Sequence, residues 1–177
     1  MEQPRAQFDT PTRAAIRRRL STWYGRHRRA LPWRRRDDDP YAQMLAELML
    51  QQTQVATVVG YFERFMARFP TVRDLAQANI DEVLALWSGL GYYSRARHLH
   101  AAARVVVQQH AGIIPSDLQA LMSLPAIGRY TAGAIASIAY DRRTPVLDGN
   151  VARVLTRLLA IAEDPKSPAV REHLWSQ

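Results

Sequence analysis

The sequence contains no cysteine, no long apolar run and no convincing strand pattern. Without cysteine the chain can form no disulfide, has no thiol nucleophile and cannot hold a metal ion or an iron–sulfur cluster through thiolates. No apolar run reaches the length of a membrane span, and residues 1–19 lack the apolar core of a secretion signal. We therefore expect a protein of the cytoplasm or nucleoid, with no membrane partner and no metal or cofactor bound by its own residues.

What is present is helical periodicity along almost the whole chain. Apolar residues make up 47% of the 177 residues, enough for the core of one ordinary domain or two small lobes. They recur at helical spacing, as at Ile16, Leu20 and Trp23, and proline or glycine ends most of the segments. The segment "TVRD", residues 71–74, opens a short helix with the spacing of a capping box. We predict an all-α protein with about eight to ten short helices.

Arginine is abundant where lysine is nearly absent. Lys166 is the only lysine, whereas eleven arginines lie between Arg5 and Arg36, and the net charge is +8. Guanidinium groups suit bidentate contacts with phosphate, so this pattern indicates a nucleic acid as partner. A solvated basic face in an arginine-biased proteome explains the charge equally well.

The segment "MLAELMLQQTQV", residues 44–55, contains a single carboxylate, Glu47. Apolar neighbours would cover every face of a helix here, and such a helix is normally buried. A carboxylate in that place is costly to desolvate unless it is paired or used. Two interpretations stay open: a structural carboxylate that is solvated or paired with arginine, or a general acid that holds its proton because it is buried.

The segment "LMSLPAIGRYTAGAIA", residues 121–136, reads as a helix, a tight turn and a second helix. A turn that leads into a helix N-terminus points backbone N–H groups outward, which binds phosphate without reading sequence. Pro125 fixes the entry to the turn, and Gly128 permits close approach of another group to the backbone. This is the helix-hairpin-helix pattern of DNA-binding proteins, although an ordinary pair of antiparallel helices gives a similar sequence.

Five segments carry a more specific resemblance. They are, in order, "LPWR", "LMLQQTQVATVVGYFERFMARFPTV", "LWSGLGYYSRARHLHAAA", "LPAIGRYTAGAI" and "LDGNVARVL". From about residue 31 to its end the chain resembles adenine-specific DNA glycosylases of the MutY type, within the helix-hairpin-helix glycosylase superfamily. The resemblance implies a central six-helix lobe at residues 31–140, with residues 1–30 and 141–177 in a second, incomplete lobe. It also implies a monomer that acts on double-stranded DNA containing mismatched adenine.

The reaction that this resemblance implies needs two carboxylates. The family hydrolyses the N-glycosidic bond of adenine mispaired with guanine or 8-oxoguanine, after the base has been flipped out of the duplex. Glu47 corresponds to the general acid and base, and Asp148 to the aspartate that stabilises the cationic sugar, as in glycoside hydrolysis. Asp148 also precedes an expected helix, where a plain N-cap is the alternative. Asn150 resembles a family residue that helps to hold this site.

Other positions are carried over from the same resemblance. Relatives that also act as lyases, such as endonuclease III, have a lysine where this chain has Tyr130, and no lysine occurs before Lys166, so we expect a monofunctional enzyme. The expected DNA- and base-binding residues are Trp33 and Arg34 of the adenine pocket, Gln51 and Gln52 of an inserted loop, Tyr92 of a wedge beside the lesion, and Leu124, Ile127 and Gly128 of the hairpin. For each of them plain packing or surface exposure is the alternative. His98 and His100 diverge on a helix, so we expect both at the surface.

The chain also departs from the family pattern. Ala126 stands where glycine is usual, which costs about 1–2 kcal/mol if the position has a positive φ. Ala46 removes a hydroxyl group close to the acid. The family continues with further helices, four cysteines that hold a 4Fe–4S cluster and a domain that recognises 8-oxoguanine. We therefore expect the cluster to be ligated beyond Gln177 and the chain to be a fragment that is not an efficient enzyme by itself. We also expect the apolar face of its N-terminal helix to be partly exposed.

Two other functions remain possible from the sequence. One is a non-catalytic helix-hairpin-helix module that binds DNA through its hairpin and arginines. The other is a glycosylase of the same superfamily with another base preference, because base preference rests on the resemblance alone. The presence of both Glu47 and Asp148 in the sequence favours an enzyme over a binding module.

Overall fold

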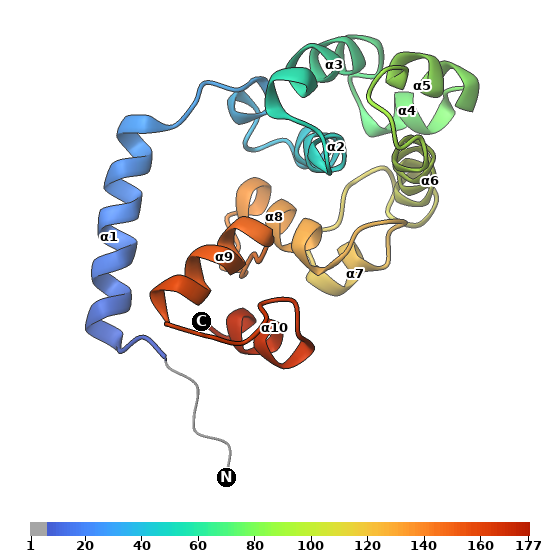
Figure 1. Cartoon of the computed structure of the whole chain (residues 1–177). Helices are drawn as coiled ribbons and strands as arrows, with labels where there is room; N and C mark the ends of the chain where they lie inside the picture. The colour runs from blue at the N-terminus through green and yellow to red at the C-terminus, as the bar shows by residue number, and fades with distance from the viewer. Residues whose placement is uncertain (1–6) are drawn as a thin grey trace. The chain divides into compact units, whose positions relative to one another are not determined.

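The computed structural model describes residues 7–177, so Arg5 and the start of the predicted N-terminal segment lie outside the described residues. Within that range the chain is helical and has no strand, which confirms the all-α prediction (Figure 1). The elements are α1 Thr10–His27, the 3₁₀ turn η1 Pro32–Arg35, α2 Pro40–Leu50, α3 Val55–Arg68, α4 Val72–Gln77, α5 Ile80–Trp87, α6 Ser94–Gln109, α7 Leu118–Met122, α8 Arg129–Tyr140, α9 Gly149–Leu158 and α10 Pro168–Trp175.

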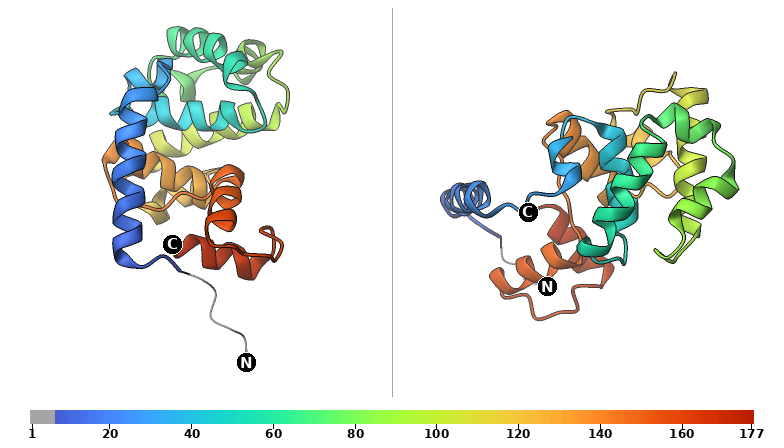
Figure 2. Two further views of the ribbon diagram at one scale, coloured as in Figure 1. Left: turned by 60° about the vertical axis from the view of Figure 1, so that its left-hand side comes forward. Right: turned by 90° about the horizontal axis from the view of Figure 1, so that it is seen from above.

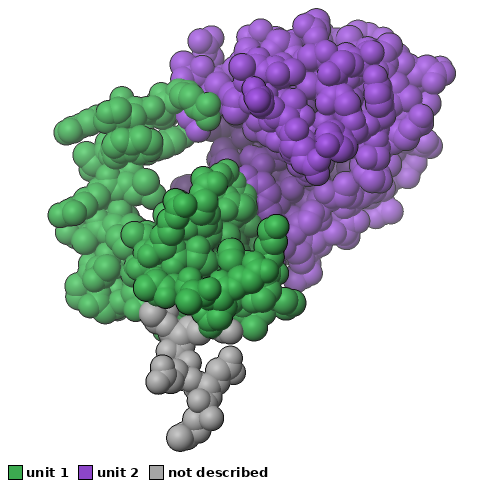
Figure 3. All heavy atoms as spheres, viewed as in Figure 1, with its two compact units in different colours: residues 1–29, 146–177 green, residues 30–145 purple. Residues whose placement is uncertain are grey.

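The chain divides into two compact units (Figure 3). The larger comprises residues 30–145 and contains η1 and helices α2 to α8, whose ribbons Figure 2 shows from two further sides. The smaller comprises residues 1–29 and 146–177. No helix in residues 7–177 has both the length and the apolar character needed to cross a membrane.

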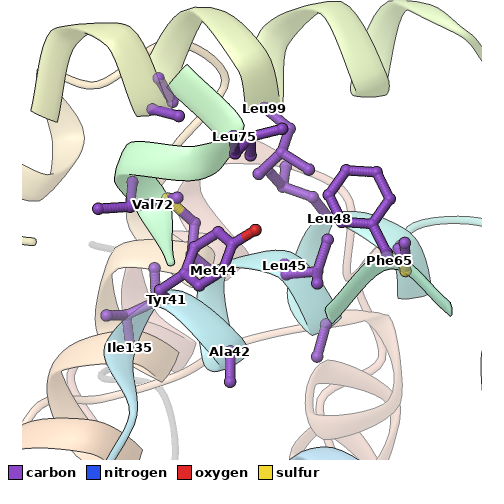
Figure 4. Packing of buried hydrophobic residues seen from close by; sticks show 14 of the residues in the cluster. Tyr41, Ala42, Met44, Leu45, Leu48, Phe65, Val72, Leu75, Leu99 and Ile135 are labelled. Carbon is purple, nitrogen blue, oxygen red and sulfur yellow. The ribbon is translucent and has the colours of Figure 1, made fainter. Parts of the chain in front are cut away.

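Helix α2 is the centre of the larger unit. It packs against α3, α6 and α8, and Figure 4 shows its side chains among those of Phe65, Leu75, Leu99 and Ile135. The Asp39 carboxylate caps its first turn by accepting from the backbone N–H groups of Tyr41 and Ala42 at 3.0 and 3.1 Å. A proline in the first turn of this helix loses no hydrogen bond. The helix that carries Glu47 is therefore fixed by the core around it.

Capping side chains set the beginnings of several other helices. The predicted capping box of α4 is confirmed, because Thr71 and Asp74 each bond the backbone N–H group of the other. Helix α7 begins directly after an aspartate. Its cap is Asp117, which accepts from the N–H group of Ala120 at 2.9 Å.

The smaller unit has a core of its own. Helices α9 and α10 pack together around the buried residues Leu147, Ala152, Leu159, Val170 and Leu174. Helix α1 contains no buried residue. Its apolar side chains Leu20 and Trp23 are 59% and 55% exposed, as expected from the sequence.

Candidate nucleic-acid interface and active site

The hairpin between α7 and α8 has the geometry that its sequence predicts. Two successive turns of backbone hydrogen bonds form it: Leu124 N–H donates to the Leu121 carbonyl, and Ile127 N–H to the Leu124 carbonyl, both at 3.1 Å. The chain then enters α8 at Gly128, and no side chain caps this helix. The first N–H groups of an α-helix lack partners within the helix. An anion in front of Gly128 would therefore meet backbone donors and the positive end of the helix dipole.

Two residues of the turn show what the backbone requires. Ala126 has φ 59°, so this position is left-handed and the conditional cost predicted for alanine applies. Gly128 has φ −85°, a conformation open to any residue, and a Cβ added there would meet nothing within 4 Å. Neither backbone conformation nor internal packing therefore requires glycine at 128. The exposed, open space in front of it is suited to close approach by an outside group.

The side chains of Leu124 and Ile127 do not face outward. They are 2% and 4% exposed and belong to the core of the larger unit. Any contact that these two residues make with DNA has to be made by their backbone. Their side chains anchor the turn from below, which leaves the backbone of Gly128 on the surface.

Glu47 is half-buried, so the prediction that α2 is covered on every side is wrong at this residue. Eight other residues of α2, including Met44, Ala46 and Leu48, are buried. The reason for the difference is helical spacing. Glu47 lies one turn from Gln51, which is half-buried too, so a narrow strip of the helix stays open at its C-terminal half. A carboxylate on this strip is held by a rigid helix yet can be reached from outside.

The "LPWR" segment packs against the first half of α2. The buried Gln43 amide donates to the carbonyl oxygens of Trp33 and Arg36, both at 2.9 Å, and so ties η1 to the helix. Trp33 itself is 6% exposed and meets the Phe62 ring edge-on, with 5.5 Å between ring centroids. Its indole therefore serves the core and has little surface left for a base. Arg34 is half-buried, and its role in an adenine pocket stays a prediction.

Tyr130 lies in the first turn of α8, where it is half-buried. Because α8 packs against α2, the helix that begins at the hairpin is also the helix beside the one that carries Glu47. The hairpin and the acid thus belong to adjoining elements of one unit. A phosphate bound at the start of α8 would therefore be separated from the helix of Glu47 only by the packed interface between α8 and α2.

Asp148 and Asn150 form a local network at the start of α9 in the smaller unit. One oxygen of Asp148 accepts from the Val151 N–H group at 2.7 Å, so this residue is the N-cap of α9. Its other oxygen accepts from the Asn150 amide at 3.1 Å, and the oxygen of that amide accepts from Arg153 at 3.0 Å. The cap and the proposed counter-charge are compatible, because both oxygens are aimed by fixed donors. Whether the carboxylate meets a sugar stays a prediction.

The predicted inserted loop and wedge share an unusual backbone. Gln52 and Tyr92 are both exposed, Tyr92 by 60%. Their φ angles are 56° and 48°, in the left-handed region that costs a non-glycine residue about 1–2 kcal/mol. Residues in such conformations persist only where the surroundings fix them, and they gather at functional sites.

Arg95, which no sequence pattern above singled out, is 6% exposed near the start of α6. Its guanidinium donates to carbonyl oxygens at the end of α2, in the loop of Gln52 and in the loop of Tyr92. Helical spacing places Arg95 on one face with Leu99, Ala102 and Val106, all of them fully buried. An arginine in register with an apolar stripe was therefore a usable indication of a buried, specifically bonded charge.

The two histidines of α6 differ in their surroundings. His98 is exposed as expected, but His100 is buried at 9% exposure, so the surface prediction is wrong for that residue. Its Nε2 lies 3.1 Å from the Ala78 carbonyl oxygen, in the segment that joins α4 to α5. Burial lowers the pKa of His100 below its ordinary value.

The residues present do not fit an iron–sulfur cluster. No cysteine occurs in the sequence, and residues 7–177 contain no group of three or more His, Asp or Glu placed to hold a metal ion.

Residues 45–177 match the family described as HhH-GPD superfamily base excision DNA repair protein. The chain belongs to the HhH-GPD superfamily. The match contains the α2 segment with Glu47, the hairpin and Asp148, and its start lies inside α2. The helix-hairpin-helix interpretation of residues 121–136 is thereby preferred over an ordinary helical hairpin.

Within the HhH-GPD superfamily, the similar curated proteins are named adenine DNA glycosylase. The protein from Rattus norvegicus is 53% identical over 169 residues, which are 91% of this chain and 33% of the relative. The one from Mycobacterium tuberculosis is 41% identical over 155 residues, 87% of this chain and 51% of the relative. The chain thus spans between about a third and half of the length of these relatives.

Solved structures of the HhH-GPD superfamily have the same fold. A thermostable thymine-DNA glycosylase matches with a TM-score of 0.77 and 26% identity over 88% of this chain and 73% of that chain. Endonuclease III in a non-covalent DNA complex matches with a TM-score of 0.76 over 95% of this chain and 77% of that chain. At 20% identity the second likeness shows the fold alone.

Proposed function

We propose that this chain carries the DNA-binding hairpin and the catalytic acid of a monofunctional adenine DNA glycosylase. Its reaction is hydrolysis of the N-glycosidic bond of adenine paired with guanine or 8-oxoguanine. The observation that carries the proposal is Glu47, a reachable carboxylate on a helix whose other faces are buried and which packs against the hairpin helix α8. The identity of the chain to proteins named adenine DNA glycosylase supports adenine as the base.

The proposed chemistry begins with a proton transfer. Glu47 in its acid form protonates the flipped adenine, and the bond between the base and the sugar then breaks with its electron pair going to the base. Water adds to the cationic sugar carbon and gives its proton to the Glu47 carboxylate, which restores the acid. The products are free adenine and an abasic sugar. The role carried over to Asp148 is that of the negative charge that stabilises the sugar cation.

Tyr130 supports a reaction without a covalent intermediate. A lyase mechanism needs an amine that attacks the sugar, and α8 begins with Arg129 and Tyr130 where lyases of the superfamily have a lysine. Lys166, the single lysine of the chain, lies in the other unit, between α9 and α10. Water is therefore the nucleophile in the proposed reaction.

The proposed partner is double-stranded DNA, bound by a monomer in the nucleoid. The backbone at Gly128 would contact phosphate, while exposed Gln52 and Tyr92 would enter the duplex beside the adenine. Exposed arginines such as Arg129 supply a positive surface next to the hairpin.

The test is Glu47→Gln, with Glu63→Gln as the matched control. Glu63 is an exposed carboxylate on α3, so its change to an amide alters charge alone. Adenine release is measured under single-turnover conditions from duplexes with adenine opposite 8-oxoguanine, guanine or thymine. We expect Glu47→Gln to slow release by about 100-fold or more while mismatch binding persists, because an amide cannot give the proton. Glu63→Gln should match the parent.

The other outcomes separate the alternatives. Release by Glu47→Gln at nearly the parent rate would remove Glu47 from the mechanism. DNA binding without base release by the parent would favour a non-catalytic binding module. Release of another base in preference to adenine would identify a different specificity within the superfamily.

A further inference from the structure

Arg95 is a buried charge whose bonds go to uncharged oxygens. Its Nη1 donates to the carbonyl oxygens of Leu48 and Met49 at 3.1 and 2.8 Å, and also to that of Gln51. The two helical carbonyls belong to the last turn of α2, where intrahelical donors are missing and the helix dipole is negative. The cation thus caps the C-terminal end of the helix that carries Glu47.

The other guanidinium nitrogen of Arg95 bonds two separate segments. Its Nη2 donates to the Thr53 hydroxyl at 3.1 Å, and to the carbonyl oxygens of Leu90 and Gly91 at 3.1 and 3.2 Å. Thr53 lies in the loop between α2 and α3, residues 51–54, and Gly91 in the loop between α5 and α6, residues 88–93. One rigid, planar group therefore fixes both loops at once.

The carbonyls that Arg95 holds stand directly before the two left-handed residues. The Gln51 carbonyl precedes Gln52, and the Gly91 carbonyl precedes Tyr92. The guanidinium carbon also lies 5.4 Å from the centroid of the Tyr92 ring. Hydrogen bonds to the same cation thus help to hold the disfavoured backbone conformations of Gln52 and Tyr92. A change in one loop therefore alters the guanidinium group that holds the other loop.

We propose that Arg95 is a positioning residue that fixes the loops of Gln52 and Tyr92 relative to each other, so that both side chains engage DNA as one unit. The proposal rests on the proposed function, in which these side chains enter the duplex. Arg95 itself is too buried to contact DNA, and it acts through the backbone of the two loops. A residue that only stabilised the fold would change stability without linking the contributions of Gln52 and Tyr92.

A double-mutant cycle tests this linkage. Affinity for a duplex with adenine opposite 8-oxoguanine is measured for the parent, Gln52→Ala, Tyr92→Ala and the double variant, all under conditions where each is folded. With Arg95 present, we expect the double variant to deviate from the product of the single losses by about fivefold or more. The same cycle is repeated with Arg95→Lys, which keeps the charge but not the fork of donors. With Arg95→Lys, we expect the affinity loss of the double variant to agree with the product of the single losses within about twofold. Arg104→Lys, an exposed arginine of α6, is the matched control and should keep the parent's deviation.

Hydrogen exchange provides an independent readout of the two loops. The N–H group of Thr53 is bonded to the Leu50 carbonyl and that of Leu90 to the Trp87 carbonyl, so each loop contains a protected amide. In Arg95→Lys both should exchange faster. If that variant fails to fold, Thr53→Val removes one acceptor while keeping the shape, and should reduce the deviation in the cycle by at least about twofold.

The outcomes separate the two proposals. No measurable DNA affinity in the parent would overturn the proposed function. Measurable affinity with independent losses from Gln52→Ala and Tyr92→Ala would overturn the coupling alone. A deviation that survives unchanged in Arg95→Lys and in Thr53→Val would also overturn it.

Discussion

Replacement of Ala126 by glycine should stabilise the larger unit, although glycine usually weakens a fold. Ala126 is exposed and has φ 59°, so its methyl group adds no buried contact and forces a strained backbone. A left-handed conformation costs a non-glycine residue about 1–2 kcal/mol, and glycine avoids this cost. Glycine makes the unfolded chain more flexible, which offsets about 0.4–1 kcal/mol of that gain. The expected net increase in the free energy of unfolding is about 1 kcal/mol.

Urea unfolding followed by tryptophan fluorescence would measure this gain, because the buried Trp33 and Trp87 report on the larger unit. With a slope of about 2 kcal/mol/M, the midpoint should rise by about 0.5 M. Ala85→Gly is the matched control, since Ala85 is exposed within the regular helix α5 and should lose about 0.5–1 kcal/mol. A loss of stability in Ala126→Gly comparable to that control would refute the left-handed backbone of the turn.

Two further predictions concern single titratable residues. Asp148→Asn should slow adenine release by about 100-fold or more and leave stability nearly unchanged, because asparagine caps a helix as well as aspartate but lacks the charge. Asp9→Asn, the same change at the N-cap of α1, is the control and should leave the rate of release unchanged. A normal rate in Asp148→Asn would show that Asp148 is a helix cap alone. The free energy of unfolding should fall as the pH is lowered from about 7.5 to about 5.5, because burial lowers the pKa of folded His100 and the unfolded chain takes up the proton first. His100→Gln, whose amide can still donate to the Ala78 carbonyl, should reduce this pH dependence measured by urea unfolding, and an unchanged dependence would contradict the assignment.

Local sequence rules predicted much of the helical framework. The capping box at Thr71 and Asp74 is present, and residues 121–136 contain the expected tight turn between two helices. These features depend on residues three or four apart, and such interactions do not need the rest of the fold. A positive φ at Ala126 was only a condition, suggested by the glycine usual at that position in the family, and the structure meets this condition.

The residues that were misjudged are those whose surroundings come from distant elements. Glu47 was expected to be enclosed, but it lies on a strip of α2 that is only half-buried. His100 was placed at the surface, although the α4–α5 connection covers it. The register of Arg95 with Leu99 indicates its burial but not its partners, because most of its acceptors are backbone carbonyls up to 47 residues away in the sequence. The periodicity of side chains predicts neither which backbone carbonyls a side chain will bond nor which part of a helix its neighbours will leave uncovered.

The burial of Arg95 has a consequence for how the protein would respond to ionic strength. Its charge is neutralised by dipoles inside the larger unit, so it releases no counterions from DNA and is screened little by salt. The exposed arginines, in contrast, would attract DNA phosphate through solvent, and their contribution to the affinity would fall steeply as salt rises. Added salt should therefore weaken the hold on the DNA backbone while the loops of Gln52 and Tyr92 keep their shape, so preference for the mismatch would outlast overall affinity.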